Sequence, residues 1–474
     1  MNKKIINKNM KKLPLLLMIT ATIVLTNSCR LYKHYERPSV NNEGLYRDTL
    51  NNADTLVVTD TLNFGNLPWQ EVFTDSYLQQ LINKGLENNT DLLKASLSVT
   101  EAEAQLKSAR LAFYPSFTFA GSGTVSSWDR QKATQTYSLP VQSSWVVDLF
   151  GSLTNAKRAQ KVNLLMVNDY QQAVRVSLIA GIANSYYTLL MLDKQLEITN
   201  QTASLTKKTW DMMVSQKKYS GASEAAVQSS KANYYAVMAS IPELKRQIRE
   251  TENSLSLLLG QSPQSIRRNK LENQSLPDDI STGLPVQLLS NRPDVHSAEM
   301  ALANCYYQTN VARAAFYPNI NISGSAGWTN AAGIAIINPG KMLASAVGSL
   351  TQPIFENGKL SAALKVAKAE QQKAYLDWQY SILNAGSEVS NALMLYQSST
   401  QKSFFEQKQI ESLERNVEVS EKLFNLGSSS YLEVISAQQY LLSAQISKIS
   451  DDFYKMQSVV NLYYALGGGK EIKK

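Results

Sequence analysis

Two short stretches of the chain alternate between polar and apolar residues. In the first, Phe117 and Phe119 alternate with serine, threonine and alanine, and in the second Ile320 follows the same pattern among asparagine and serine. A period of two with one polar and one apolar face is typical of half-buried strands. Each stretch is followed by a less regular apolar segment, so we predict two strand pairs, at residues 116–148 and 319–353.

A very long helix is predicted after each strand pair, at residues 152–217 and 359–424. With a rise of 1.5 Å per residue, about 66 helical residues span on the order of 100 Å, which is longer than an ordinary globular domain. Sharp turns at Gly221 and Gly427 are expected to lead into a return helix in each case.

The return helices carry a heptad pattern. In the second one, apolar residues recur every seven positions, at Ile435, Leu442, Ile449, Met456 and Tyr463. This spacing predicts a coiled-coil seam. The core of an ordinary helical bundle would show the same stripe, so the heptads indicate long packed helices and no particular function.

An internal repeat relates these elements. Leu153 matches Leu360 and Ser223 matches Ser430 at a constant offset of 207, and Pro115 matches Pro318 at an offset of 203. Each half therefore starts with a helix of about 25–35 residues that runs to a Phe-Tyr-Pro step, where proline ends it. The predicted segments are a signal peptide at 1–28, an N-terminal segment at 29–66, a first repeat at 67–262, a linker at 263–290, a second repeat at 291–467 and a tail at 468–474.

Local signals mark where helices and strands meet. Glycine suits the position that follows a helix, so Gly260 and Gly467 are expected to end the two return helices. The strand-to-helix joints are predicted at Pro115, Pro318, Asp148, Gly151, Pro353 and Gly358.

The N-terminus reads as an export signal. Residues 1–12 are basic and residues 13–25 are apolar, a run that is too short for the ~20 residues that cross a bilayer as a helix. The residues that end at Cys29 resemble the lipobox of bacterial lipoproteins, so Cys29 is the candidate lipid attachment site. An ordinary signal peptide with an incidental Cys29 is the alternative.

Composition excludes several classes of protein. The net charge is +8, but residues 1–28 contain five lysines and no acidic residue, so the excess indicates targeting and no nucleic-acid partner. Two histidines and two cysteines exclude a zinc finger or a disulfide scaffold. We find no nucleophile-base arrangement and no phosphate loop, and we predict no enzyme, no cofactor and no metal site. The adjacent carboxylates Asp451 and Asp452 are predicted to lie on a solvated helix face.

The strands have the length that crosses a membrane in a barrel, about ten tilted residues. Four strands cannot close a barrel, and an open edge cannot exist in lipid. Two, three or four copies of the chain would therefore be required. Aromatic residues near the strand ends suit an interfacial girdle, although packing at the joints would place them there too.

Several motifs are spread along the chain after Cys29. They are Tyr35 and Pro38, LPWQEVFTDSYLQQLINKGLENNTDL from Leu67, Asp148-Leu149-Phe150-Gly151, LSNRPDVHSAE from Leu289 to Glu299, TQPIFENGKL from Thr351 and GSSSYLEVISAQ from Gly427. Jointly, these motifs resemble the TolC-like outer-membrane efflux proteins, most closely the lipoprotein branch that serves RND-type drug efflux. The resemblance covers nearly all of the chain after Cys29.

The resemblance implies a mainly α fold with membrane β: an internally duplicated chain that gives four strands to a trimeric 12-stranded barrel, continued by a periplasmic helical barrel. It also implies a homotrimer in outer-membrane lipid, a periplasmic adaptor and an inner-membrane RND transporter, with Gly221 and Gly427 at the periplasmic tips. A duct for type I protein secretion and a structural coiled-coil lipoprotein are the rival functions.

The resemblance further places a periplasmic gate at Leu432, Ser436 and Gln439. Relatives typically have leucine, an acidic residue and a basic residue at these positions, so Ser436 and Gln439 replace a charged pair. The hypothesis is that closure depends on apolar packing and neutral hydrogen bonds, so that gating is less sensitive to salt and pH. The alternative is that both polar residues are ordinary helix surface.

Overall fold

The structure is a computed structural model that describes residues 32–39, 64–129, 131–219, 222–275, 291–329 and 342–469. The predicted sites at Cys29 and Gly221 lie outside these residues. The chain divides into two compact units, which are described separately. Unit 1 comprises residues 1–40, 98–168 and 297–379, and unit 2 comprises residues 41–97, 169–296 and 380–474.

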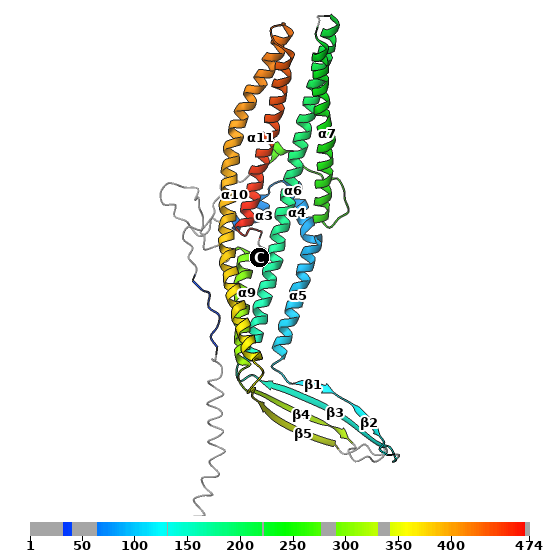
Figure 1. The fold of residues 1–474 in the computed structure, drawn as a ribbon, viewed down its shortest axis with the longest axis vertical. Coiled ribbons are helices and arrows are strands. Elements are labelled where there is room, and N and C mark those ends of the chain that lie inside the picture. The colour runs from blue at the N-terminus through cyan, green and yellow to red at the C-terminus, as the bar shows by residue number, and fades with distance from the viewer. Residues whose placement is uncertain are drawn as a thin grey trace, which may run out of the picture. The chain divides into compact units, whose positions relative to one another are not determined.

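The elements are mostly helices, with one small sheet (Figure 1). In chain order they are η2 (Phe64–Asn66), α3 (Trp69–Val72), α4 (Ser76–Asn88), α5 (Thr90–Leu111), β1 (Ser116–Phe119), β2 (Ser122–Ser126), β3 (Thr134–Val147), α6 (Ser152–Tyr219), α7 (Glu224–Leu258), η3 (Leu271–Asn273), α9 (Pro293–Ala314), β4 (Asn319–Thr329), β5 (Met342–Thr351), α10 (Lys359–Asn425) and α11 (Tyr431–Ala465).

The five strands of unit 1 form one antiparallel sheet (Figure 1). β3 pairs with both β1 and β2 on one side and with β4 on the other, and β5 pairs with β4. Among the described residues, β1 and β2 therefore form one free edge of the sheet and β5 forms the other.

The register gives the sheet two chemically different faces. Residues opposite one another on neighbouring strands share a face. One such row is Thr118, Gln142, Ser325 and Ser345, and the next row, on the other face, is Phe119, Val141, Ala326 and Ala344. None of the residues in the five strands is charged.

The first predicted strand is interrupted between β1 and β2, which the sequence alternation did not predict. The Ala120 amide donates to the Pro140 carbonyl at 3.1 Å, but Pro140 has no N–H to return the bond. On the other side of Pro140 lies Gly327, where an added Cβ would come within 2.4 Å of the Pro140 backbone. The strand break and the glycine both follow from the proline in β3.

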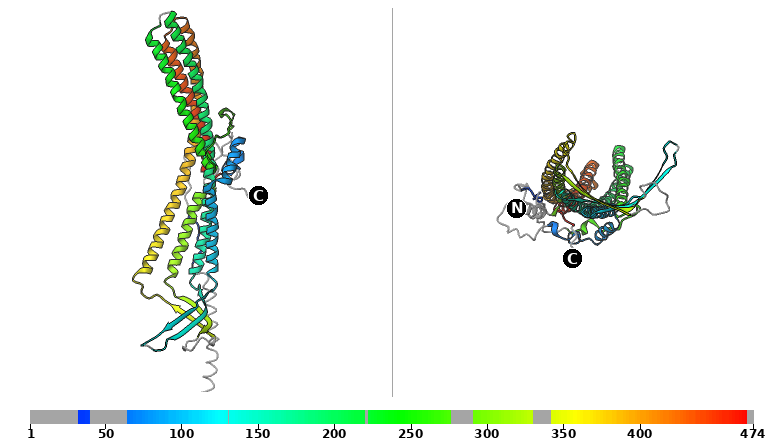
Figure 2. Two further views of the ribbon diagram at one scale, coloured as in Figure 1. Left: turned by 90° about the vertical axis from the view of Figure 1, so that its right-hand side faces the viewer. Right: turned by 90° about the horizontal axis from the view of Figure 1, so that it is seen from below.

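Unit 2 contains the packed part of the long helices. α7 lies beside α6, and α11 lies beside α10 (Figure 2). The apolar stretch of α6 is buried there, with Ile179, Ile182 and Leu189 at most 1% exposed. α6 is also the one described helix that is apolar enough over 18 residues to cross a membrane by composition, and 56% of that window is buried.

The heptad stripe of α11 faces inward. Ile435, Ile449, Met456 and Tyr463 are at most 7% exposed, and Leu442 is half-buried. The predicted helix-ending glycines, Gly260 and Gly467, have φ values of +66° and +76°. These local predictions are confirmed.

The helix before each Phe-Tyr-Pro step is shorter than predicted. α5 and α9 have 22 residues each, and both end before the aromatic pair. The reason is a tight turn, in which the Tyr114 amide donates to the Leu111 carbonyl and the Tyr317 amide donates to the Ala314 carbonyl. Pro115 and Pro318 then stand directly before β1 and β4.

Candidate channel site

The turn from β3 into α6 is built around Asp148. Its carboxylate accepts hydrogen bonds from the amides of Leu153 and Thr154, at 2.9 and 2.7 Å, and from the Thr154 hydroxyl at 2.7 Å. These are unpaired donors of the helix N-terminus, where a negative charge is favoured. Gly151 has a φ of +72°, a conformation that suits glycine. The two predicted joint residues thus form one capped turn.

The turn from β5 into α10 is built differently. Gly358 has a φ of +79° and Asn357 a φ of +50°. The residue that the repeat aligns with Asp148 is Phe355, which is 82% exposed, so this turn has no carboxylate cap at that position. Pro353 lies just after β5. At this position the turn into α6 has a carboxylate that caps the helix, whereas the turn into α10 has only its backbone conformation.

Aromatic residues at the joints divide into packed and exposed side chains. Phe150 stacks on Tyr317 with ring centroids 4.9 Å apart, and the Trp145 indole donates to the Phe113 carbonyl at 3.0 Å. Tyr114, at 69% exposure, remains open to the surroundings. Some of these side chains pack the joint, and others are free to meet an interface.

The predicted gate residues lie near the start of α11. Leu432, Ser436 and Gln439 are all exposed, and their spacing of four and three places them on one side of the helix. The Gln439 amide donates to Asn233 Oδ1 of α7 at 2.8 Å. In the described chain the contact of Gln439 is therefore with a neutral amide, as expected if no charged pair is used.

The sequence analysis did not single out Gln438, although it makes more contacts than its neighbour. Gln438 is 2% exposed, and its side-chain amide donates to Thr209 Oγ1 of α6 at 3.0 Å and to Glu421 Oε1 of α10 at 3.1 Å. One glutamine thus ties α11 to two other helices beside the predicted gate. Gln438 is buried because the helix turns its side chain toward α6 and α10, whereas the next residue, Gln439, is exposed. Nothing in the neighbouring sequence distinguishes these two glutamines.

Arg292 of the NRPD motif forms a buried network of ion pairs and hydrogen bonds. Its guanidinium, 3% exposed, forms a bidentate pair with Asp294, and Nη1 donates to Glu388 of α10 at 2.6 Å and to the Ala465 carbonyl at the end of α11. Burial alone would raise the pKa of Asp294, but the hydrogen bonds from Arg292 lower it. The motif joins the start of α9 to α10 and α11.

The N-terminal segment of residues 32–39 is bound to α9 by a motif that the sequence analysis quoted without a role. Arg37 forms a bidentate pair with Glu299, at 2.7 and 2.6 Å, and the Glu299 side chain is 5% exposed. Tyr35 packs edge-on against Tyr306. The last residue of the LSNRPDVHSAE motif therefore holds the segment that follows Cys29.

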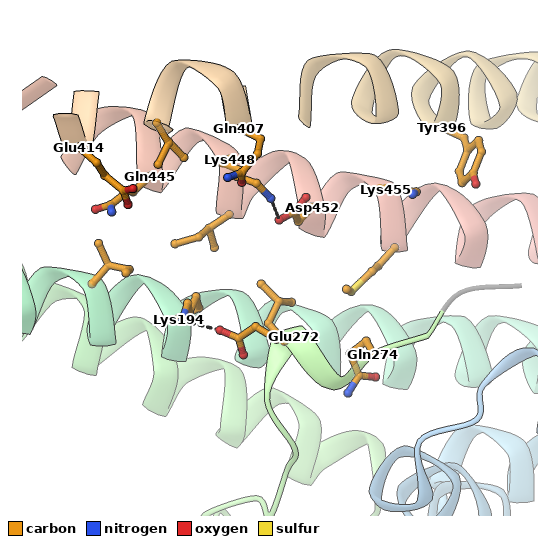
Figure 3. Close-up of a pocket in the computed structure, with 15 residues that line it drawn as sticks. Lys194, Glu272, Gln274, Tyr396, Gln407, Glu414, Gln445, Lys448, Asp452 and Lys455 are labelled. Carbon is orange, nitrogen blue, oxygen red and sulfur yellow. Dashed lines mark hydrogen bonds and ion pairs between the residues drawn. The ribbon is translucent and has the colours of Figure 1, made fainter. Parts of the chain in front are cut away.

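A cavity of about 520 Å³ lies among α6, η3, α10 and α11 of unit 2 (Figure 3). Its charged residues are mostly paired, with Lys194 bound to Glu272 and Lys448 bound to Asp452. The bond to Glu272 raises the pKa of Lys194, and the bond to Lys194 lowers the pKa of Glu272. In the described part of the chain, no group of three or more His, Cys, Asp or Glu side chains could hold a metal ion.

One prediction about charged residues is wrong. Asp451 does not lie on a solvated face, because only 4% of its side chain is exposed, and Lys402 donates to its Oδ1 at 2.7 Å. Asp452, its neighbour, is half-buried and binds Lys448. Adjacent residues on a helix point about 100° apart, so one can face the neighbouring helix while the other faces outward.

These features define a class of protein. A sheet with an uncharged polar face and an apolar face suits a barrel wall between water and lipid. Its strands run directly into helices of 68 and 67 residues, which are grouped as hairpins. Together they describe a membrane channel with a long helical extension.

Comparison with known proteins names the family. Residues 81–261 and 284–468 match the family model described as outer membrane efflux protein. The chain is 28% identical over 472 residues to the cation efflux system protein CusC of Escherichia coli K12, which covers 96% of this chain and 99% of that protein. It is 26% identical to the probable outer membrane lipoprotein SilC of Salmonella typhimurium, over 96% of this chain and 98% of that one.

Solved structures agree with this relation. A crystal structure of CusC is similar with a TM-score of 0.80 and 27% identity, covering 88% of this chain and 99% of that one. The open-state outer membrane channel MtrE of Neisseria gonorrhoeae has a TM-score of 0.81 at 24% identity, covering 92% and 98%. The chain belongs to the outer membrane efflux protein family. It is the outer-membrane channel of a tripartite efflux system, and the predicted TolC-like fold is confirmed.

Proposed function

We propose that three copies of this chain close one exit duct, which an inner-membrane RND transporter drives through a periplasmic adaptor. The observation that carries the proposal is the sheet, which has one polar face, one apolar face and two free edges among the described residues. Open edges are not viable in lipid, so β5 of one copy pairs with β1 and β2 of the next. Such a head-to-tail contact closes into a ring.

The polar face lines the duct, and the apolar face contacts lipid. The strand residues are uncharged, so the wall offers hydroxyl and amide groups to the cargo. CusC is described as a cation efflux protein, and a further relative of 27% identity, from Pseudomonas putida, is described as a solvent efflux pump outer membrane protein. We infer a cargo of small molecules or metal cations and assign the cargo's selection to the pump.

Leu432, Ser436 and Gln439 form the periplasmic gate in this proposal. Their exposure in the single chain leaves them available to face the duct axis or a neighbouring copy. The contact of Gln439 with the Asn233 amide supports closure by neutral hydrogen bonds. Gly221 and Gly427 form the tips that meet the adaptor.

Cys29 is proposed to carry the lipid. It lies outside the described residues, but Tyr32, three residues later, contacts the joint at Gly151, where an added Cβ would come within 3.3 Å of its ring. Three residues reach at most about 10 Å, so the anchor can lie at the level where strands become helices. The Cys29→Ser variant should lose incorporation of labelled palmitate, whereas a Cys305→Ser variant should keep it.

The experiment that tests the function compares a deletion strain with the complemented strain. Accumulation of metal cations, of an organic solvent and of several dyes is measured, and an adaptor is sought by co-purification. Raised accumulation of at least one compound together with recovery of an adaptor supports the proposal. Unchanged accumulation combined with loss of a secreted protein would support the type I secretion duct instead.

A further inference from the structure

The second helical hairpin, α10 and α11, contains two acidic residues that the first hairpin lacks. At the repeat offset, Glu406 aligns with Thr199 of α6, and Asp451 aligns with Leu244 of α7. The two hairpins otherwise have matching bounds, since α7 and α11 both have 35 residues. A hairpin of this length therefore packs without the two carboxyl groups.

The carboxyl groups of Glu406 and Asp451 lie at the same level of α10 and α11. Glu406 Oε1 accepts a hydrogen bond from the Ser447 hydroxyl at 2.7 Å, and Asp451 Oδ1 accepts one from Lys402 at 2.7 Å. Ser447 lies one turn before Asp451 and Lys402 lies one turn before Glu406, so these two contacts bring the two carboxyl groups together between the helices. The other oxygen of each group, Glu406 Oε2 and Asp451 Oδ2, is buried and has no hydrogen-bond partner among the described residues.

Two ionised carboxylates cannot hydrogen-bond to each other, because neither has a proton to donate. A single proton between them would satisfy both buried oxygens at once. Burial and the neighbouring Asp451 raise the pKa of Glu406, while Ser447 and Lys402 oppose that rise.

Other charged and polar groups surround Glu406 and Asp451 on α10, α11 and α6. Lys402 of α10 and the Tyr454 phenol of α11 are the other titratable groups that act on the site, and Asp452 of α11 is paired with Lys448 one turn away. α6 presents a neutral contact there, from Gln195 to Ser450. One lysine therefore balances one of the two negative charges, which leaves the second to be neutralised by a proton.

We propose that Glu406 and Asp451 form a proton-binding site that ties α10 to α11, and that loss of this proton as the pH rises loosens the second hairpin and leaves the first unchanged. Glu406 binds its proton more tightly in the folded chain than in the unfolded chain. The folded state then holds more protons above the ordinary glutamate pKa, so its stability falls as pH rises through that window. The inference does not depend on the proposed cargo or partners.

The site can also affect the proposed gate, because α11 carries Gln439 twelve residues before Asp451, about 18 Å along the helix. A looser hairpin at high pH would then favour opening. This consequence rests on the proposed function, whereas the proton site itself does not.

The test measures hydrogen exchange of the full-length protein in detergent at about pH 5 and about pH 8, corrected for the intrinsic pH effect. We expect peptides around residues 406 and 451 to lose protection several-fold at the higher pH, because the folded state binds the proton more tightly than the unfolded state. Peptides around residues 199 and 244 should keep theirs. In the Glu406→Gln variant the amide donates to Asp451 at both pH values, so its protection should not change with pH.

Glu414→Gln is the matched control, because it removes an exposed carboxyl from the same helix and should keep the wild-type pH response. A second readout is the protonated-carboxyl band in infrared difference spectra between the two pH values, which should be lost in Glu406→Gln. Equal protection of the second hairpin at both pH values in the wild type, or an unchanged pH response in Glu406→Gln, would overturn the proposal. Either result is obtained without any transport assay and so leaves the efflux function untouched.

Discussion

The two helical hairpins have the same plan but differ in their polar contacts. α6 and α7 match α10 and α11 in length to within one residue, and both return helices end at a glycine with positive φ. α11 nevertheless has more buried residues than α7, and it reaches α6, α7 and α10 through Gln438 and Gln439. Duplication has thus kept the backbone plan, while the side-chain contacts make α11 the central helix of unit 2.

The same divergence is visible where each return helix ends. In the first repeat the Asn89 amide donates to the Leu258 carbonyl at 3.0 Å, and in the second Arg292 donates to the aligned Ala465 carbonyl at 3.2 Å. Asn89 and Arg292 align at the offset of 203. The equivalent carbonyl therefore accepts a hydrogen bond from a neutral amide in the first repeat and from an ion-paired arginine in the second.

Replacing Arg292 should give the largest effect. Arg292→Ala leaves Asp294 and Glu388 without their cation, and we expect a loss of about 3 kcal/mol in stability, the low end for breaking a buried ion pair because both acids keep some access to water. Thermal unfolding of the detergent-solubilised protein measures this. Arg292→Lys restores one charge without the bidentate geometry and should lose less. Equal losses in both variants would show that geometry, and not charge, supplies the stability.

The aligned change in the first repeat should cost less. Asn89→Ala removes the bond to the Leu258 carbonyl and the cap of α5, where Asn89 Oδ1 accepts the amides of Asp91 and Leu92, for about 2 kcal/mol in total. Asn89→Ser keeps an uncharged acceptor for the cap and loses the donor to Leu258. Unfolding by heat should place Asn89→Ser between the wild type and Asn89→Ala, and a position outside that range would contradict the assignment.

The two joints give a third comparison. Asp148→Ala removes the carboxylate that caps α6, and we expect a loss of about 1 kcal/mol. Asp148→Asn keeps an acceptor but removes the charge and should retain part of the effect. Hydrogen exchange of residues 152–158 measures local fraying, and the aligned start of α10, which has Phe355 in place of the cap, should exchange faster than the start of α6 in the wild type.

The smallest effect on stability is expected at the predicted gate. Gln439→Ala removes one part-buried hydrogen bond to Asn233, worth about 0.5 kcal/mol at the low end for such bonds because Gln439 itself is exposed, but should raise the open probability of single channels in planar bilayers. Ser436→Ala, on the same face with no contact to α7 among the hydrogen bonds described, serves as the control. In the wild type, the open probability should change little with salt concentration. A steep rise of the open probability with salt would contradict closure by neutral hydrogen bonds.

Local signals in the sequence predicted the helices well. The long helix predicted at 359–424 is observed at Lys359–Asn425, because glycine turns and heptads depend on neighbouring residues only. The two faces of the sheet also followed from alternation. The break between β1 and β2 did not, because its cause, Pro140, lies on the opposite strand.

The site was harder to predict for the same reason. The role of Asp451 depends on Glu406 and Lys402, which lie more than forty residues earlier on another helix. Likewise, the sequence analysis quoted Glu299 at the end of a motif and did not single out Arg37, and only the fold brings the two together. Polar residues were assigned to surfaces because nothing local reveals a partner.

The free edges of the sheet have a consequence for genetics. In a closed ring of identical copies, every junction needs the β5 edge of one chain and the β1–β2 edge of the next. A copy with one damaged edge can still join a ring through its intact edge and leave that ring unsealed. Edge variants co-expressed with the wild-type chain should therefore act dominantly, whereas variants that prevent a chain from folding should be recessive.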